Sequence, residues 1–182
     1  MNTKNPVSNI LKRRAVFFDR DGTLMEEVHF CNNPAHVRTF PGMKDALAQL
    51  REAGWLIFVI TNQSGMTRGI VSQPQYEAVH KELLRQLDHQ IDATYFCPEL
   101  SESPRRKPNI GMVLEAASDF PVNLSQSYFI GDKASDIECG KRAGMRTILV
   151  STGYGVQNQN CGADYLFSDA LAAANFILKM SS

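Results

Sequence analysis

Short apolar runs alternate with amphipathic segments along most of the chain. Consecutive apolar residues predict strands at 15–18, 55–60, 93–97, 128–130 and 147–150. Between them, apolar residues recur at spacings of three and four over 43–50, 73–90, 111–119 and 134–143, which predicts helices. Strands that alternate with helices favour an α/β fold, an open Rossmann-like parallel sheet with helices on both faces.

Length and composition narrow the class of protein. A chain of 182 residues predicts one domain, which we place at 13–182 after a flexible tail at 1–12. The formal net charge is zero and no basic stripe carries interleaved aromatics, so nucleic acid is not an expected partner. With no apolar run near the ~20 residues of a membrane span and no secretory leader, we expect a cytoplasmic monomer without membrane contact. The four cysteines form no CxxC pair, which favours reduced thiols.

Two carboxylates follow the first predicted strand, in the stretch VFFDRDGTL. In an open parallel sheet, ligands bind beyond the carboxyl ends of the strands, so Asp19 and Asp21 are expected in the ligand crevice. Ionised carboxylates at the end of a buried strand are costly unless a cation or hydrogen-bond donors meet them. An acidic turn is the plainer interpretation, since Asp-Gly is a common turn pair. The complete pattern D-x-D-G-T favours a metal or cationic partner instead.

The other strand ends carry complementary chemistry. Thr61 and Asn62 supply donors suited to phosphate oxygens, and the segment RRKP brings Lys107 after the third strand. Such a basic run alone is usually a solvated surface. The stretch GDKASD places Asp132 at the end of the fourth strand and Asp136 at a helix start, which Asp136 could also simply cap. Together these groups suit Mg²⁺-assisted phosphoryl transfer.

In this order, DRDGT, TNQSG, RRKP and GDKASD resemble the four motifs of the haloacid dehalogenase-like phosphatases over nearly the whole chain. The longer strings FPGMKDAL, TNQSGMTRG, FCPE and RRKPNIGM are most similar to the sugar-bisphosphate and histidinol phosphatases of that family. The resemblance implies that Asp19 is the nucleophile that forms an aspartyl phosphate, and that Asp21 is the general acid and base. It further implies that Thr61 and Lys107 hold the transferring phosphoryl group.

The resemblance also implies a ligand set. Mg²⁺ would be held by Asp19, the main-chain oxygen of Asp21 and Asp132, with Asp136 in support. Substrate contacts are expected from side chains in the segments after the first, second and fourth strands and before Lys107. These residues are Glu27, Phe30, Asn62, Gln63, Ser64, Arg68, Arg106 and Lys133.

Three departures from the family pattern are informative. Many members bind a structural zinc through CxH and CxC pairs, but FCPELSESPRRKP keeps only Cys97, so no structural zinc is expected. The family's D-x-G-Y becomes Glu27-Val28-His29-Phe30, which changes a segment expected to touch substrate. The intervals between motifs have no room for the separate cap domain of related enzymes, which predicts an open site.

We therefore expect a Mg²⁺-dependent phosphatase of a sugar bisphosphate, in the first place D-glycero-D-manno-heptose 1,7-bisphosphate, on a route to lipopolysaccharide or other glycoconjugates. Another small monoester such as histidinol phosphate is the alternative, if the segment 27–30 no longer serves a second phosphate. A binding protein on a catalytically dead scaffold is disfavoured by the four complete motifs. The residues do not identify the anomer, the organism or the pathway.

Overall fold

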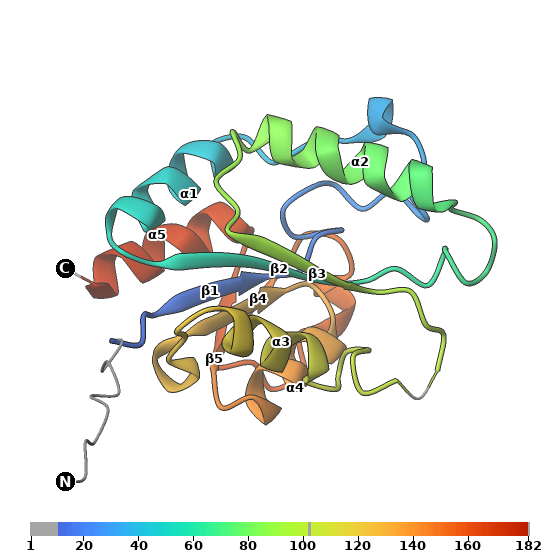
Figure 1. Ribbon diagram of the computed structural model, residues 1–182. Helices are drawn as coiled ribbons and strands as arrows, with labels where there is room; N and C mark the ends of the chain where they lie inside the picture. Colours follow the sequence, from blue (N-terminus) through green and yellow to red (C-terminus); the bar gives the residue numbers. More distant parts are fainter. Residues whose placement is uncertain (1–10, 102, 182) are drawn as a thin grey trace, which may run out of the picture.

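Six parallel strands form one sheet at the centre of the molecule, in the order β3-β2-β1-β4-β5-β6 (Figure 1). The structure, a computed structural model, describes residues 11–101 and 103–181. The strands are β1 (Ala15–Phe18), β2 (Leu56–Asn62), β3 (Ala93–Cys97), β4 (Tyr128–Gly131), β5 (Arg146–Val150) and β6 (Tyr165–Phe167). The helices are α1 (Met43–Glu52), α2 (Gln73–Gln86), α3 (Gly111–Asp119), α4 (Ala134–Arg142) and α5 (Ala170–Ser181).

Helices cover both faces of the sheet, with α1, α2 and α5 on one side and α3 and α4 on the other (Figure 1). The surroundings of strand β1 explain why its sequence is uniformly apolar. Val16 and Phe18 belong to the core beneath α1 and α5, while Ala15 and Phe17 belong to the core beneath α3. All four side chains are fully buried, because a central parallel strand is covered on both faces.

The predicted α/β architecture is confirmed, including the absence of a separate cap domain. In the described chain, the segment between β1 and α1 is a loop that carries only the 3₁₀ turn Pro34–His36. The predicted tail at 1–12 lies almost entirely outside the described residues and stays a prediction. The four cysteines are free thiols, as predicted. Among the described residues, no helix is both long enough and apolar enough to cross a bilayer.

The structure corrects the predicted ends of one strand and one helix, and it adds two elements. Strand β2 continues to Asn62, two residues past its predicted end, and so carries Thr61 within the sheet. Helix α2 ends at Gln86 instead of residue 90, because Asp88 and His89 adopt left-handed backbone angles with φ of 52° and 54°. Strand β6 and helix α5 were not predicted, although they complete one edge of the sheet and one face of the core.

The strand order places β1 and β4 side by side at the centre, where the order of the strands reverses. Residues of β1 pair in parallel with β2 on one side and with β4 on the other. In open α/β sheets, ligands bind at this switch point, beyond the carboxyl ends of the strands. Asp19 follows β1 and Asp132 follows β4, so the topology brings the two carboxylates to the same place.

Candidate active site

Three buried carboxylates meet at the switch point. Asp19, Asp132 and Asp136 are exposed by only 4%, 0% and 1%, and their oxygens lie within 4.8 Å of one another. The main-chain N–H of Asp19 donates to the carbonyl of Ile130 over 2.9 Å, which fixes the end of β1 against β4. Asp136 also accepts a hydrogen bond from the N–H of Lys133 at 3.0 Å, so it caps α4 as well as facing the cluster.

Lys107 lies between two of these acids. Its Nζ is 2.7 Å from Asp19 Oδ1, 2.7 Å from Asp136 Oδ1 and 2.7 Å from the carbonyl oxygen of Ile60. The side-chain amide of Asn62 holds the Lys107 backbone from both sides, accepting from its N–H and donating to its carbonyl, each over 3.1 Å. Asn62 was expected to touch substrate, and here its amide positions the lysine. A direct contact of Asn62 with substrate stays a prediction.

Burial sets the protonation behaviour of the cluster. It raises the pKa of the Asp19 carboxyl to about 6, although Lys107 beside it acts in the opposite direction. Burial, with the nearby Asp19 and Asp136, raises the pKa of Asp132 to about 7. Burial alone would lower the pKa of Lys107, but Asp136 and Asp19 outweigh it and raise that pKa, so the lysine stays charged. The raised pKa values of Asp19 and Asp132 indicate that a further cation at the cluster would stabilise their ionised forms.

The carboxylate cluster fits a hard divalent cation. Asp132 Oδ1 is buried and has no hydrogen-bond partner among the described residues, while Asp132 Oδ2 accepts from the N–H of Tyr154 at 2.8 Å. The donors are all oxygens, which suits Mg²⁺ better than zinc. Within the described ranges, this is the one group of three or more His, Cys, Asp or Glu side chains with metal-compatible spacing. The expected absence of zinc stays a prediction.

Two glycines allow the backbone to close around Asp132. Gly22 and Gly153 have φ of 82° and 55°, a region that side chains rarely adopt. A Cβ at either position would collide with the Asp132 carboxylate. The hydroxyl of Thr152 donates to the carbonyl of Gly22 over 2.6 Å and joins the two glycine segments. The glycine of the DRDGT stretch is therefore required by close packing as well as by the turn.

The carboxylate of Asp21 is held by a buried arginine and a glutamine. Arg20 is 1% exposed, and its Nε and Nη2 each lie 3.0 Å from an Asp21 oxygen. Gln63 accepts from Arg20 at 3.0 Å, donates to Asp21 at 2.8 Å, and also donates to Thr61 Oγ1 at 2.8 Å. The Arg20 guanidinium lies 5.5 Å from the ring centre of Tyr76. Sequence reasoning missed Arg20, to which it assigned no role.

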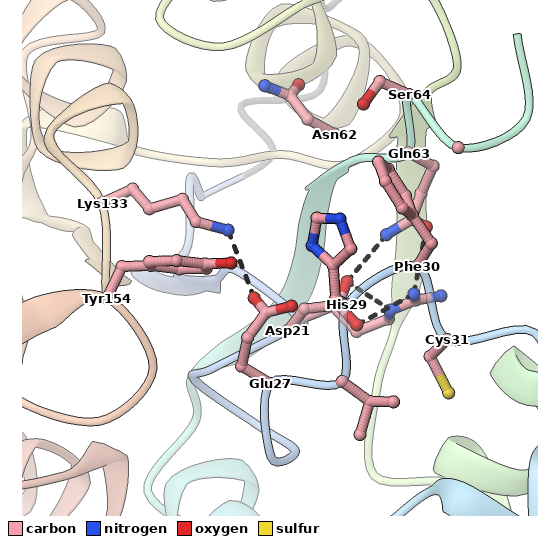
Figure 2. A pocket seen from close by; sticks show the side chains of 13 residues that line it. Asp21, Glu27, His29, Phe30, Cys31, Asn62, Gln63, Ser64, Lys133 and Tyr154 are labelled. Carbon is pink, nitrogen blue, oxygen red and sulfur yellow. Dashed lines mark hydrogen bonds and ion pairs between the residues drawn. The ribbon is translucent and has the colours of Figure 1, made fainter. Parts of the chain in front are cut away.

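A cavity of about 220 Å³ opens beside the cluster (Figure 2). Six of the predicted substrate-binding residues line it: Glu27, Phe30, Asn62, Gln63, Ser64 and Lys133. Lys133 Nζ lies 3.4 Å from Glu27 and 4.5 Å from the ring centre of Tyr154 (Figure 2). A smaller hollow of about 40 Å³, lined by Asp19, Thr61 and Lys107 among others, shares Asp21, Asn62 and Lys133 with the cavity. The reaction centre therefore connects to a polar cavity with aromatic walls.

Two predicted substrate-binding arginines do not line this cavity. Arg68 is exposed, and Nη1 of Arg106 donates to the carbonyl of Glu99 over 2.8 Å within its own loop. Their contact with substrate stays a prediction. Sequence reasoning missed Tyr154 and Cys31 as lining residues. The first of these lies far along the chain after β5, where no strand-end acid or base marked the loop.

Comparisons with known proteins agree with this geometry. A family model described as HAD-hydrolase-like matches residues 104–174. The chain is 36% identical to D-glycero-D-manno-heptose-1,7-bisphosphate 7-phosphatase of Thermosynechococcus vestitus, over 92% of this chain and 96% of that protein. It is 39% identical to D-glycero-beta-D-manno-heptose-1,7-bisphosphate 7-phosphatase of Rhodopseudomonas palustris, over 74% and 81%.

A solved structure is similar over nearly the whole fold. The D,D-heptose 1,7-bisphosphate phosphatase of B. bronchiseptica, complexed with magnesium and phosphate, superposes with a TM-score of 0.85 at 29% identity. The match covers 92% of this chain and 99% of that one.

Proposed function

The chain belongs to the haloacid dehalogenase-like phosphatases, and from this membership we propose that it removes the 7-phosphate of D-glycero-D-manno-heptose 1,7-bisphosphate. The observation that carries the proposal is Lys107 joined to Asp19 and Asp136, beside Asp132 and a polar cavity. A nucleophile, a fixed cation and a carboxylate cluster at one point are the groups that phosphoryl transfer requires.

We propose Mg²⁺ as the cofactor. Asp19, Asp132 and the main-chain oxygen of Asp21 would hold it, with Asp136 in support. When bound, the cation masks the negative charge of the phosphate that faces the Asp19 carboxylate. The magnesium in the B. bronchiseptica structure and the oxygen-only donor set of this chain support the assignment.

Different residues of the chain carry out the separate steps of the reaction. An Asp19 oxygen attacks phosphorus, the bond from phosphorus to the leaving oxygen breaks, and Asp21 gives that oxygen a proton. Asp21, now a carboxylate, takes a proton from water, and the resulting hydroxide attacks phosphorus and releases phosphate from Asp19. Lys107 and Thr61 hold the oxygens of the transferring group, where negative charge must be stabilised. These roles are supported by the motif order and by the burial of Asp19 and Lys107.

The cavity supports a substrate larger than phosphate alone. Lys133 supplies a cation on its wall, and the rings of His29 and Phe30, with centres 4.2 Å apart, supply an aromatic surface. A sugar carrying a second phosphate would use both kinds of group, because an uncapped site gains selectivity from the substrate's own charge. We also propose that the protein acts as a cytoplasmic monomer in carbohydrate metabolism, an interpretation supported by its free cysteines.

One feature of the cavity wall favours a second candidate substrate. The segment Glu27-Val28-His29-Phe30 differs from the family pattern and forms part of the cavity wall. If it has lost the site for a second phosphate, a monoester such as histidinol phosphate becomes the better substrate. The ratio of kcat/KM values for heptose 1,7-bisphosphate and histidinol phosphate distinguishes the two proposals.

Substitution of the two acids tests the mechanism. Asp19→Asn should abolish phosphate release, because the amide keeps the shape of the side chain but is not a nucleophile. Asp21→Asn should accumulate phosphoenzyme from p-nitrophenyl phosphate, since a good leaving group departs without a proton but hydrolysis of the intermediate needs a base. An acid-stable ³²P-labelled protein band is the readout. Full activity in Asp19→Asn would overturn the mechanism, whichever substrate is used.

A further inference from the structure

A second hollow lies at the opposite end of the sheet from the candidate active site. Its volume is about 350 Å³, and residues at the amino ends of four strands line it together with the end of α5. In Figure 1 this is the end at which β1 begins and α5 terminates. The lining residues are Arg14, Trp55, Gln126, Tyr128, Arg146 and Met180.

Two guanidinium groups at this hollow are held on aromatic rings. Arg14 Cζ lies 4.4 Å from the ring centre of Trp55, and Arg146 Cζ lies 5.5 Å from that of Tyr128. The rings of Trp55 and Tyr128 are themselves 5.8 Å apart, and Nη1 of Arg146 donates to the Tyr128 hydroxyl over 2.8 Å. Stacking restrains a guanidinium while leaving N–H groups at its edge free to donate.

Neither Arg14 nor Arg146 forms an ion pair within the described chain. Asp164 is near enough to act on Arg146, but its carboxylate accepts from the N–H and the hydroxyl of Thr147 at 2.7 and 2.8 Å. Lys12, which precedes Arg14 in the basic run KRR, is exposed. This end of a chain with zero net charge is therefore locally basic.

Trp55, which lines the hollow, also carries a buried donor. The residue is 2% exposed, and its indole N–H has no acceptor among the described residues. Buried polar groups are normally paired, so this N–H departs from the usual pattern. The hollow itself is lined by two guanidinium groups without a carboxylate partner, two aromatic rings, and the side chains of Gln126 and Met180.

We propose that this hollow binds a small phosphorylated molecule at a site separate from the reaction centre. Guanidinium groups recognise phosphate through paired N–H donors, and they do so better than an ammonium group because their geometry is fixed. The volume lies within the range of pockets for small ligands. Inorganic phosphate and a phosphorylated sugar share the required chemistry. The proposal does not depend on the substrate assigned to the active site.

Tryptophan fluorescence tests the proposal directly, because Trp55 is the only tryptophan of the chain. The full chain carrying Asp19→Asn, which prevents turnover, is titrated with inorganic phosphate and separately with ribose 5-phosphate. Sodium chloride at matched ionic strength is the reference. We expect a saturable change in emission with either phosphate, and a half-saturating concentration at least tenfold higher after Arg14→Gln with Arg146→Gln. Tighter binding of ribose 5-phosphate would identify a sugar phosphate as the better ligand.

Three further variants, made in the same Asp19→Asn background, make the test specific. Arg14→Lys with Arg146→Lys keeps the charge and should bind with intermediate affinity, even if the glutamine pair folds poorly. Arg142→Gln removes an exposed arginine that pairs with Glu138 away from the hollow, and Lys133→Gln alters the active-site cavity. Both should leave the titration unchanged. The proposal is overturned if Lys133→Gln alone removes the signal, if the arginine pair variants titrate like the parent, or if chloride gives the same response.

Discussion

Asp21 is the residue whose observed contacts constrain its proposed role most. Both of its carboxylate oxygens accept hydrogen bonds, from Arg20 and from Gln63. Because donors face both oxygens, the orientation of the carboxylate is fixed. Arg20 and Gln63 therefore position the group that would protonate the leaving oxygen.

Replacement of Gln63 tests that positioning. Gln63→Leu removes one donor to Asp21 and should lower kcat roughly tenfold on an alkyl phosphate, a part of the 10²–10⁴-fold that general acid catalysis contributes. The loss on p-nitrophenyl phosphate should stay below about threefold, because nitrophenolate leaves without a proton. Ser64→Ala, which lines the same cavity without contacting Asp21, is the matched control. Equal losses on both substrates would show that Gln63 serves the fold instead.

Single residues at strand ends were predictable and their partners were not. Asp19 and Asp132 directly follow β1 and β4, whose carboxyl ends a parallel sheet brings together, and Lys107 lies in the loop after β3. Arg20 contacts Gln63, which is 43 residues away, and nothing in the local sequence indicates that this arginine turns into the core. Asn62 was assigned to substrate because it follows Thr61, yet its amide faces the Lys107 backbone. Partner choice depends on loop geometry, which local patterns do not encode.

Among the elements, α4 couples the start of a helix to the carboxylate cluster. Gly131 ends β4, and a Cβ there would collide with the side chain of Asp136, which both caps α4 and pairs with Lys107. A Cβ added at Gly140 would also be crowded, but by core side chains: it would lie 2.7 Å from Thr147 Cγ2 and 2.8 Å from Phe129 Cβ. A side chain at either glycine would therefore meet similar steric hindrance, but only Gly131 lies beside the carboxylate cluster.

A pair of alanine variants exploits this difference. Gly131→Ala and Gly140→Ala should each lower the free energy of unfolding by about 1–3 kcal/mol, the usual cost of overpacking. Only Gly131→Ala should also raise the Mg²⁺ concentration for half-maximal activity, by at least tenfold, since it displaces Asp136. Urea unfolding and metal titrations of both variants provide the comparison. A similar rise in Gly140→Ala would mean that the metal response reflects stability alone.

Helix α2 carries a histidine whose burial predicts a pH dependence of stability. Burial lowers the pKa of His80 from its ordinary 6.5 to about 4, with the cation of Arg20 acting in the same direction. Because the unfolded chain binds the proton more readily, the contribution of His80 to stability is complete above pH 6.5 and is lost as the pH falls towards 4. The Nδ1 of His80 has no hydrogen-bond partner among the described residues.

Comparison with His80→Leu isolates this effect from the buried carboxylates, which titrate in both proteins. Between pH 7.5 and 5.5, the wild type should lose about 1 kcal/mol more unfolding free energy than the variant. Urea denaturation at the two pH values measures the difference. An identical pH response of the two proteins would show that His80 is accessible to protons in the folded state.

Elements were predictable where they were long or strongly patterned. The core helices α1 and α3 followed the spacing of their apolar residues, whereas β6 spans only Tyr165–Phe167 and has no buried residue. Helix α5 was missed although Ala170, Ala173, Ala174 and Ile177 are buried at helical spacing. Small alanine side chains make a weak apolar signal in a sequence, yet they allow α5 to pack closely against α1 and the sheet.

At the scale of the whole molecule, the open reaction centre and the oxygen-only cluster predict the metal dependence. Activity should require Mg²⁺, be removed by EDTA and return when Mg²⁺ is added, because three buried carboxylates meet there and Asp132 has no ion-pair partner among the described residues. A zinc-selective chelator should leave activity intact, since the loop before Lys107 keeps only Cys97. Elemental analysis and initial rates check both parts. One tightly bound zinc per chain would contradict the interpretation of that loop.

The position of β1 in the middle of the sheet has a consequence for how the protein reaches its working state. Asp19 meets Lys107 across 88 residues, and Gly22 meets Thr152 across 130. Contacts between residues this far apart in the sequence form slowly, because closing the intervening loop costs conformational entropy before the contact contributes any stabilisation. Any partly folded species that lacks β4 or the segment around Lys107 also lacks the metal cluster or its cation. We therefore expect a chain that has not yet assembled these segments to show no phosphatase activity.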